Sequence, residues 1–442
     1  MRKYLVLIIA LGLQCLAGQN RPAPQGNSHF VTTDGRLFRD AEGKPLLLHG
    51  MGVANKSKDQ GYTAGIERSD LAAIRSWGMN CIRLAIFWDG IEPQPGKIDR
   101  AYLDRVAQIV AWAKAENVYV LLDMHQDLCS VKYSDGAPAW ATLDEGKPHT
   151  TGAVWSDSYY ASEAVQTALD HFWVNSPAPD GKPLQEHYAM AWRAVAERFK
   201  DEPAVLGYDL MNEPFPGRDA ARVMQATMQR LSELLAAKKL PKAPTMEELV
   251  GMEATPEGRR QITSWLGDMQ LYQSMIEAPA PIMQDFDRQR LMPMYTRVRQ
   301  AIRGVDPNHI LFIEPAMSAN MGIRSAVVPL RDEFGRRDPQ QAYAPHGYDI
   351  VVDTGSQDLN NHARIELIFR RHGELARKYN LPMLVGEWGA FNPEAQSVEV
   401  ARFTVRQFDA LSCGDTFWAY RHGFEHSPLL PALTRHPAPV HP

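Results

Sequence analysis

The chain has 442 residues, of which 45% are hydrophobic and 22% are charged, as in a globular protein with a large core. Its formal net charge of -5 and its lack of a long basic run argue against nucleic acid as a partner. Length alone permits one to three domains, and a single α/β barrel with long loops reaches this size.

The N-terminus has the pattern of a secretory signal peptide. Two basic residues precede an apolar run over residues 4–16, and two small residues follow it. A run of this length is too short to span a bilayer comfortably. We therefore expect cleavage of residues 1–18, a linker over residues 19–28, and a secreted or periplasmic protein. A lipoprotein anchor at Cys15 is the alternative, and Gln14 before it argues against that.

Residues 30–48 predict a small hairpin, with turns at Asp34-Gly35 and Glu42-Gly43. Such a hairpin can cap the floor of a barrel.

Short apolar runs then alternate with longer segments of helical periodicity. The apolar runs predict strands at Leu46–Gly50, Asn80–Phe87, Val118–His125, Val205–Asn212, His309–Glu314, Ala342–Tyr348, Met383–Glu387 and Thr416–Tyr420. The helical segments are Ile66–Trp77, Arg100–Glu116, Leu184–Lys200, Asn361–Tyr379 and Pro393–Leu411. Eight such repeats favour a closed (β/α)₈ TIM barrel of the α/β class. We expect a catalytic barrel over residues 29–433, a short last helix within Ser427–Leu433, and a disordered tail over residues 434–442.

Two connections are long, and long loops in compact domains are usually functional. Residues 128–183 follow the third strand and contain Trp140, Trp155 and Trp173. Residues 215–304 follow the fourth strand and contain half of the methionines. The tryptophans could stack on sugar rings or pack in the interior. The Met-rich segment could form an adaptable apolar wall for a lipid, or extra helices packed on the barrel.

Three cysteines remain beyond the signal, Cys81, Cys129 and Cys413, and their spacing fits no zinc pattern. One disulfide at most can form among them. Cys81 lies within a predicted strand, so we expect a buried thiol.

Active sites of βα barrels lie at the carboxyl ends of the strands, and here those ends carry many polar side chains. They are Arg83, Asp123, His125, Asp127, Asn212, Glu213, His346, Tyr348, Glu387 and Trp418. Glycoside hydrolysis needs two carboxylates that flank one bond. Glu213 and Glu387 follow the fourth and seventh strands, which face each other across the barrel, so we expect a retaining separation of roughly 5–5.5 Å. Two unrelated ion-paired glutamates are the alternative.

Several motifs together resemble glycoside hydrolase family 5, whose clan comprises retaining barrels with catalytic glutamates on strands four and seven. The motifs are YDLMNEPF (Tyr208–Phe215), GEWG (Gly386–Gly389), HGY (His346–Tyr348), WDGIEPQPGKID (Trp88–Asp99) and Trp418. LLDMHQD (Leu121–Asp127), followed by GAPAWAT (Gly136–Thr142), is similar to a narrower branch, the endoglycoceramidases, which cleave between a glycan and its lipid. The sequence departs from that branch at Cys129, where an aromatic residue is expected, and in its Met-rich segment.

The resemblance implies that Glu213 is the acid/base and Glu387 the nucleophile. Arg83 and Tyr348 would hydrogen-bond Glu387 and keep it ionised, and His346 would lie near Glu213. The two glutamates would then titrate apart.

The resemblance also implies a set of sugar-binding residues. Asn212 would hold the 2-hydroxyl group, and Trp418 would form a flat apolar floor. The outer hydroxyls would be bound by His125, Asp127 and Lys56, with Lys58 an equal candidate to Lys56 on position.

We therefore expect a retaining β-glycosidase that needs neither cofactor nor metal and acts on glycosphingolipids or related glycolipids, with transient contact to a membrane surface. Its oligomeric state is open. The alternatives are an exo-acting β-glucosidase or β-galactosidase on simple glycolipids or steryl glucosides, and a cellulase- or mannanase-like enzyme. More distant ones are a non-catalytic carbohydrate-binding barrel and a metal hydrolase with ligands from His125, Asp127, Glu213 and His346.

Overall fold

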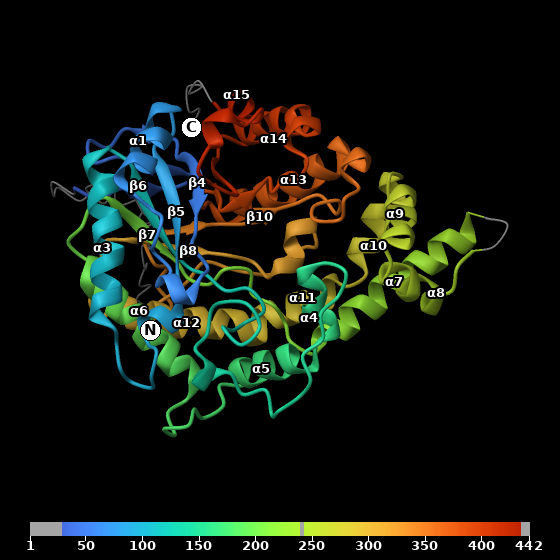
Figure 1. The fold of residues 1–442 in the computed structure, drawn as a ribbon, viewed down its shortest axis with the longest axis horizontal. Coiled ribbons are helices and arrows are strands. Elements are labelled where there is room, and N and C mark those ends of the chain that lie inside the picture. The colour runs from blue at the N-terminus through green and yellow to red at the C-terminus, as the bar shows by residue number, and fades with distance from the viewer. Residues whose placement is uncertain (1–28, 239–242, 435–442) are drawn as a thin grey trace, which may run out of the picture.

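The structure is a computed structural model that describes residues 29–238 and 243–434. At its centre eight parallel strands are paired in the order β11-β13-β4-β5-β6-β7-β8-β9 (Figure 1). Their bounds are β4 (His49–Val53), β5 (Cys81–Ile86), β6 (Tyr119–Met124), β7 (Val205–Asp209), β8 (Ile310–Ile313), β9 (Gln341–Tyr343), β11 (Leu384–Val385) and β13 (Gly414–Phe417). A parallel bridge between Tyr343 and Met383 joins the two edge strands. The predicted eight-stranded barrel is therefore confirmed.

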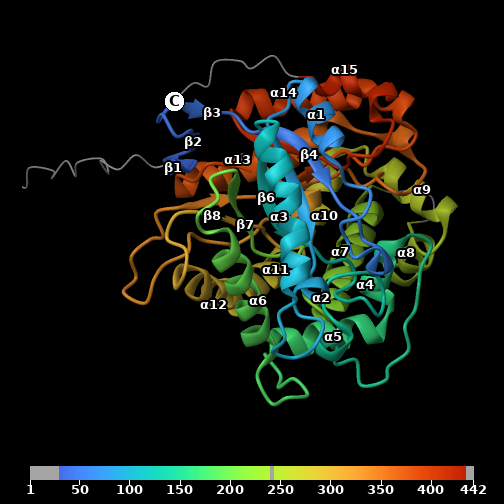
Figure 2. The same cartoon turned by 60° about the vertical axis from the view of Figure 1, so that its left-hand side comes forward.

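Helices surround the barrel on its outside, as Figures 1 and 2 show. They are α1 (Arg68–Ser76), α3 (Arg100–Ala115), α6 (Leu184–Phe199), α12 (Met292–Arg303), α13 (His362–Tyr379), α14 (Val398–Leu411) and the short α15 (Leu430–Leu433). The helix α3 begins after Asp99, whose side chain accepts a hydrogen bond from the Tyr102 main-chain N–H. Between β8 and β9, residues 314–340 contain one short 3₁₀ helix, η5 (Met317–Met321), and no α-helix. One of the eight repeats thus lacks its helix.

The sixth and seventh strands are each split, which corrects the sequence prediction. The predicted strand Ala342–Tyr348 is observed as β9 and β10 (His346–Gly347), separated at Pro345, which has no main-chain N–H to donate to a ladder. The seventh strand continues after β11 as β12 (Glu387–Trp388). In the pairing of β10 with β12, His346 lies opposite Glu387. The split therefore places a histidine beside one of the two candidate glutamates.

The N-terminal segment forms three antiparallel strands rather than a two-stranded hairpin. They are β1 (Thr32–Asp34), β2 (Leu37–Arg39) and β3 (Pro45–Leu46), and Figure 2 shows them together at one end of the barrel. Leu46 belongs to this sheet. The first barrel strand therefore starts at His49, three residues later than predicted. Phe38 stacks on Phe312 with 5.9 Å between the ring centroids. The small sheet thus caps the floor of the barrel, as expected.

Two hydrophobic clusters hold these layers together. The smaller one fills the lower barrel with buried side chains from the strands and from the capping sheet, including Leu48, Leu121, Ile310 and Leu384. The larger one lies between the strands and the surrounding helices. Burial on both faces explains why the strands read as continuous apolar runs.

The loop after β6 contains α4 (Ser158–Ala161) and α5 (Glu163–Trp173), and its tryptophans differ in role. Trp173 is buried, and its indole N–H donates to the Phe215 carbonyl at 2.7 Å. Trp140 is half-buried against the ring of Trp88. Trp155 is 42% exposed, so it alone of the three presents a large surface to solvent.

The Met-rich segment forms extra helices beside the barrel, at the right of Figure 1. They are α7 (Asp219–Ala237), α8 (Met246–Glu253), α9 (Pro256–Trp265), α10 (Met269–Glu277) and α11 (Ala280–Phe286). Leu266, Tyr272 and Ile276 are buried in the larger cluster, and Trp265 and Met269 pack partly buried against it. The structure therefore favours packing helices over an open apolar wall.

The remaining expectations fall partly outside the described residues. The predicted signal, the linker and all but Thr434 of the predicted tail lie there. Cys81 and Cys129 are free thiols, and Cys81 is buried as predicted. Within residues 29–238 and 243–434, no helix combines the length and the apolar character needed to cross a bilayer.

Candidate active site

The two glutamates converge at the carboxyl ends of the barrel strands. Glu213 follows β7, Glu387 begins β12, and each is 5% exposed. The Nδ1 atom of His346 lies 2.9 Å from Oε1 of Glu213 and 3.6 Å from Oε2 of Glu387. One oxygen of Glu213 lies within 4.8 Å of one oxygen of Glu387. The two buried carboxylates therefore face one common space, with Nδ1 of His346 close to both.

Each glutamate has its own set of hydrogen-bond donors. Glu387 accepts from Nη1 of Arg83 at 2.6 Å and from the Tyr348 hydroxyl at 2.9 Å. Glu213 accepts from Nδ2 of Asn320 at 2.6 Å and from His346. The main chain of Glu213 has φ +44°, which a non-glycine residue rarely adopts. Donors from three separate segments, β5, η5 and β10 with the residue after it, thus orient the pair.

Arg83 is the central cation of the site. Its side chain is 0% exposed and contacts four carboxylates at distances from 2.6 to 3.0 Å. These belong to Asp123, Asp209, Glu314 and Glu387. Its Nη2 also donates to Oδ1 of Asn212 at 2.9 Å. A single buried guanidinium therefore compensates several acidic side chains, which explains why an arginine lies on an otherwise apolar strand.

We expect Arg83→Met to lower the free energy of unfolding by about 3–5 kcal/mol at neutral pH, because it leaves buried carboxylates without a partner. Burial already raises the pKa of Asp123 and of Glu314 to about 7, although Arg83 opposes that rise. Without Arg83 these folded-state pKa values rise further. A raised folded-state pKa favours folding below the unfolded-state pKa, and that benefit is lost as pH rises through the folded value.

The deficit of the variant should therefore be larger near pH 8 than near pH 5, and urea unfolding at both pH values measures it. Arg198→Met is the control, because Arg198 forms an exposed ion pair with Asp104 and should cost less than about 1 kcal/mol. An equal deficit at the two pH values would contradict the expectation.

The pKa values of the two glutamates shift in opposite directions, in keeping with the expectation that they titrate apart. Burial raises the pKa of Glu387 above its ordinary value, and the charges of His346 and Arg83 counter only part of that effect. Burial also acts on Glu213, yet the hydrogen bonds from His346 and Asn320 bring its pKa below the ordinary value. Burial by itself lowers the pKa of His346. The negative charges of Glu314 and Glu387 outweigh that effect and raise the pKa well above the usual range. The charge of Arg83 is divided among four carboxylates, so it does not fully offset the effect of burial on Glu387.

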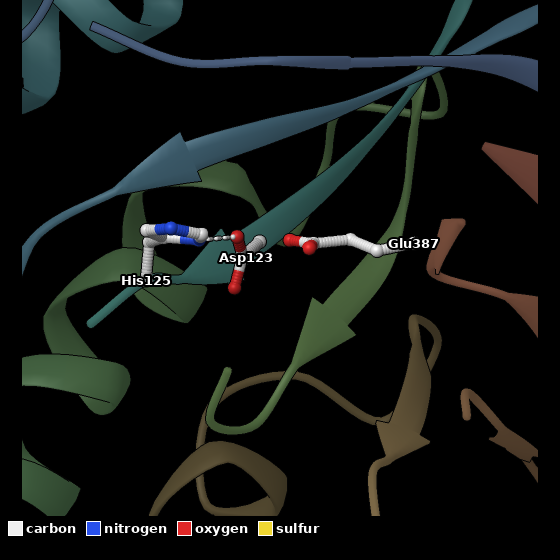
Figure 3. A group of neighbouring side chains, drawn as sticks. All are labelled: Asp123, His125 and Glu387. Carbon is white, nitrogen blue, oxygen red and sulfur yellow. Dashed lines mark hydrogen bonds and ion pairs between the residues drawn. The ribbon is translucent and has the colours of Figure 1, made fainter. Parts of the chain in front are cut away.

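His125 and Trp418, two of the predicted sugar-binding residues, lie in contact with each other. His125 follows β6, and its ring stacks on Trp418 with 5.3 Å between centroids and 8° between planes. Figure 3 shows His125, Asp123 and Glu387 directed toward the same space, with Nδ1 of His125 2.7 Å from Oδ2 of Asp123. Burial lowers the pKa of His125 to about 3, so this ring is neutral near pH 7. It offers a hydrogen-bonding edge beside an aromatic floor.

Lys56 and Lys58, equal on sequence position, are separated by the structure. The amine of Lys56 contacts the Asp127 carboxylate and lies 5.1 Å from the centroid of a Trp418 ring. Lys58 instead pairs with Asp89 at 2.8 Å. Lys56 therefore shares the site with His125, Asp127 and Trp418, and Lys58 does not contact that group.

Sequence reasoning missed several residues of the site. Glu314 ends a predicted strand and Asp209 lies within another, so a charge in an apolar run was an available signal. Asp135 lies 4.0 Å from Lys56 through Oδ2 and has a pKa raised to about 8, chiefly by burial. Asn320 lies in η5, and no pattern in its loop marked it.

The metal-hydrolase alternative requires His125, Asp127, Glu213 and His346 to surround one ion. The structure instead divides these four residues between two groups of possible ligands. Among the described residues, His125 and Asp127 group with Asp135, whereas Glu213 and His346 group with Glu387. The first group already contains the amine of Lys56, and Glu387 in the second is paired with Arg83. A divalent cation would have to share each space with a resident positive charge. This donor set fits a charge-compensated carboxylate site better than a metal centre.

The comparisons with known proteins agree with this architecture. Endoglycoceramidase I of Rhodococcus hoagii (strain 103S) is 33% identical over 228 residues, which cover 47% of this chain and 44% of that protein. A glucosylceramidase of Rhizopus delemar (strain RA 99-880 / ATCC MYA-4621 / FGSC 9543 / NRRL 43880) is 27% identical over 245 residues, covering 42% of this chain and 36% of that protein. The matches therefore span less than half the length of these curated relatives.

A solved structure is similar over a much larger part of the chain. Endo-glycoceramidase II from Rhodococcus sp., as its lactosyl-enzyme intermediate, has a TM-score of 0.66 and 27% identity, covering 91% of this chain and 81% of that one. The family model for cellulase, glycosyl hydrolase family 5, matches residues 39–423. The resemblance predicted from the motifs is thus confirmed, and the chain belongs to glycosyl hydrolase family 5.

Proposed function

We propose that this protein is a retaining β-glycosidase that hydrolyses the bond between a glycan and its lipid. The observation that carries the chemistry is the close approach of Glu213 and Glu387, with oxygens within 4.8 Å of one another. Retaining enzymes hold their carboxyl groups about 5–5.5 Å apart, whereas inverting enzymes hold them about 6.5–9.5 Å apart. A gap this small suits direct attack by one carboxylate on the sugar.

In the first step Glu387 attacks the anomeric carbon, and the bond to the leaving oxygen breaks as Glu213 donates a proton to that oxygen. Arg83 and Tyr348 orient Glu387 through both of its carboxylate oxygens. In the second step the Glu213 carboxylate takes a proton from water, whose oxygen attacks the same carbon and releases Glu387. The product keeps the β configuration because two displacements occur.

The proton that Glu213 donates is shared between Glu213 and His346, which lie in hydrogen-bond contact. In the free enzyme the raised pKa of His346 favours the proton on Nδ1, 2.9 Å from Oε1 of Glu213. Transfer along this short contact gives a neutral imidazole and a protonated Glu213. A bound sugar also displaces water near Glu213, which favours the neutral carboxyl group.

Sugar recognition follows from the groups beside Glu387. The face of Trp418 would stack on the sugar at the cleavage point, and Asn212 would bind its 2-hydroxyl group. His125, Asp127 and Lys56 would bind the outer hydroxyls, since all three lie next to Trp418 or to one another.

The choice of a glycolipid rests on the names of the similar proteins, endoglycoceramidases and a glucosylceramidase. Another structure of endo-glycoceramidase II from Rhodococcus sp., 26% identical with a TM-score of 0.64, is described as a complex with ganglioside GM3. The protein would meet such substrates through transient contact with a membrane surface. Secretion or periplasmic export is also proposed, from the N-terminal pattern, and sequencing the N-terminus of the mature protein would test it.

Incubation with lactosylceramide and with glucosylceramide, followed by analysis of the released sugar, tests the substrate. Intact lactose means cleavage at the lipid bond, whereas galactose alone means exo action on the terminal sugar. Glucose from glucosylceramide without any product from lactosylceramide favours the glucosylceramidase-like alternative. Absence of product from both lipids, with activity on cellulose or mannan, would reject the lipid proposal and leave a polysaccharide hydrolase.

We expect a bell-shaped pH profile of kcat/KM, displaced upward at both limbs. The acid limb reports ionisation of Glu387, whose pKa burial raises above the ordinary glutamate value of about 4.3. The alkaline limb reports loss of the proton held by His346 and Glu213, and a raised pKa of His346 retains that proton beyond about pH 6.5. Initial rates with an aryl β-glycoside measure both limbs. An alkaline limb below about pH 6.5 would contradict this expectation.

A further inference from the structure

Glu314 is a third buried glutamate of the site that the two-step mechanism does not use. It follows β8, is 1% exposed, and uses both carboxylate oxygens. Oε2 accepts from the main-chain N–H of Glu213 at 2.8 Å. Oε1 lies 2.8 Å from Nη2 of Arg83 and 3.2 Å from Nε2 of His346. Glu314 thus contacts the proposed acid/base through its main chain and, on the other side, through its imidazole partner.

These contacts restrain the two features of Glu213 that matter for proton transfer. The main chain of Glu213 has φ +44°, a conformation that surrounding contacts must hold in place. The hydrogen bond to Glu314 fixes the N–H of that same residue. Nε2 of His346 has no aligned hydrogen-bond partner among the described residues, so the nearby Glu314 oxygen supplies the negative charge that faces it.

Resting on the proposed function, we propose that Glu314 is the positioning residue of the acid/base. Its carboxylate holds the Glu213 main chain in place and orients the His346 ring, so that Nδ1 points at the Glu213 carboxyl group. Glu314 touches neither the sugar nor the reacting atoms in this proposal. It acts on catalysis only through Glu213.

Asp123 provides a matched comparison on the same arginine. Its Oδ1 lies 3.0 Å from Nη2 of Arg83, the atom that Glu314 also contacts. Its other oxygen pairs with Nδ1 of His125, and Asp123, His125 and Glu387 lie close together in Figure 3. No hydrogen bond or ion pair among the described residues joins Asp123 to Glu213 or His346. The two carboxylates therefore share a cation, but of the two it is Glu314 that contacts Glu213 and His346.

The test is Glu314→Gln, which keeps the shape and one acceptor oxygen, assayed with aryl β-glycosides of different leaving groups. Protonation helps a phenolate of high pKa to depart and is hardly needed for dinitrophenolate. We expect kcat/KM to fall about 10-fold or more for the phenyl glycoside and less than about 3-fold for the dinitrophenyl glycoside. The control Asp123→Asn should lower both rates by a similar factor, because the described contacts of Asp123 are with Arg83 and His125 and not with the acid/base.

A double-mutant cycle separates action through Glu213 from any other action. In a Glu213→Ala background, Glu314→Gln should change the rate with the phenyl glycoside by less than about 2-fold, against about 10-fold or more when Glu213 is present. Rates that fall equally for all leaving groups, or a Glu314→Gln effect that persists without the Glu213 side chain, would overturn the proposal.

Circular dichroism and thermal unfolding show whether Glu314→Gln is folded. If it is not, Glu314→Asp provides the same test, since it retains the charge but is too short to keep both contacts. If Glu314→Asp lowered the rates of the phenyl and the dinitrophenyl glycoside by the same factor, that result would likewise overturn the positioning role. Failure of the proposed function looks different, because wild-type protein would then cleave neither aryl β-glycosides nor glycolipids.

Discussion

Glu387→Gln is expected to lower kcat by about 10⁴-fold or more, because the amide cannot form the glycosyl–enzyme bond. The isosteric side chain keeps one acceptor oxygen for Arg83, and its amide NH2 group can donate to the Tyr348 hydroxyl, so substrate binding should remain. Initial rates with an aryl β-glycoside measure the loss, and calorimetry with an uncleaved substrate measures binding. A 2-deoxy-2-fluoro glycoside should label the wild-type protein at Glu387 and leave the variant unlabelled, which mass spectrometry of peptides detects.

Glu366→Gln is the control for this experiment. This variant carries the same chemical change on the exposed face of α13. Its rate should equal that of the wild-type protein within about 2-fold. A Glu387→Gln protein with more than about a tenth of wild-type activity would reject the nucleophile assignment. Label found on Glu213 instead would exchange the two roles.

Glu213→Ala is expected to slow glycosides with poor leaving groups by about 10²- to 10⁴-fold, the usual contribution of a general acid. Glycosides with dinitrophenyl leaving groups should form the intermediate at a nearly normal rate and then accumulate it, because no base activates water. Added azide should restore turnover, since it needs no general base, and should yield a β-glycosyl azide. Burst kinetics and product analysis by nuclear magnetic resonance measure these effects.

The configuration of the azide product also tests the geometry. A β product requires attack from the face left open by Glu387, which follows from the two carboxylates flanking one space. An α-glycosyl azide, or a rate that azide does not change for any leaving group, would contradict the acid/base role. His346→Ala should give a milder form of the leaving-group dependence, because His346 acts on Glu213 and on Glu387 alike.

Much of the barrel could be predicted because its signals are local. Strands buried on both faces are continuous apolar runs, and the helices between them show regular periodicity, so most elements agreed within a few residues. The prediction of one continuous strand over residues 342–348 was wrong, because the strand is interrupted at Pro345, although that proline was visible in the sequence. The capping sheet gained a third strand because Leu46 pairs with Phe38, a choice between two adjacent sheets that periodicity does not encode.

The candidate site was predictable where a residue ends a strand. Glu213, Glu387, His346 and Tyr348 lie in short motifs at the carboxyl ends, and barrel topology alone directs those ends to one face. Asn320 could not be found in this way. It lies in a 3₁₀ turn, 107 residues from the Glu213 side chain to which it donates.

The sequence by itself determined the fold class, the family and the two candidate glutamates, because these depend on local patterning and on the topology of a parallel barrel. Only the tertiary structure decided which lysine joins the site, how the Met-rich helices pack, and which glutamate holds the higher pKa. Those outcomes depend on burial and on charges brought together from distant segments. Arg83 illustrates this, because its four acidic partners come from four different strands or strand ends, and their competition for one charge exists only in the folded chain.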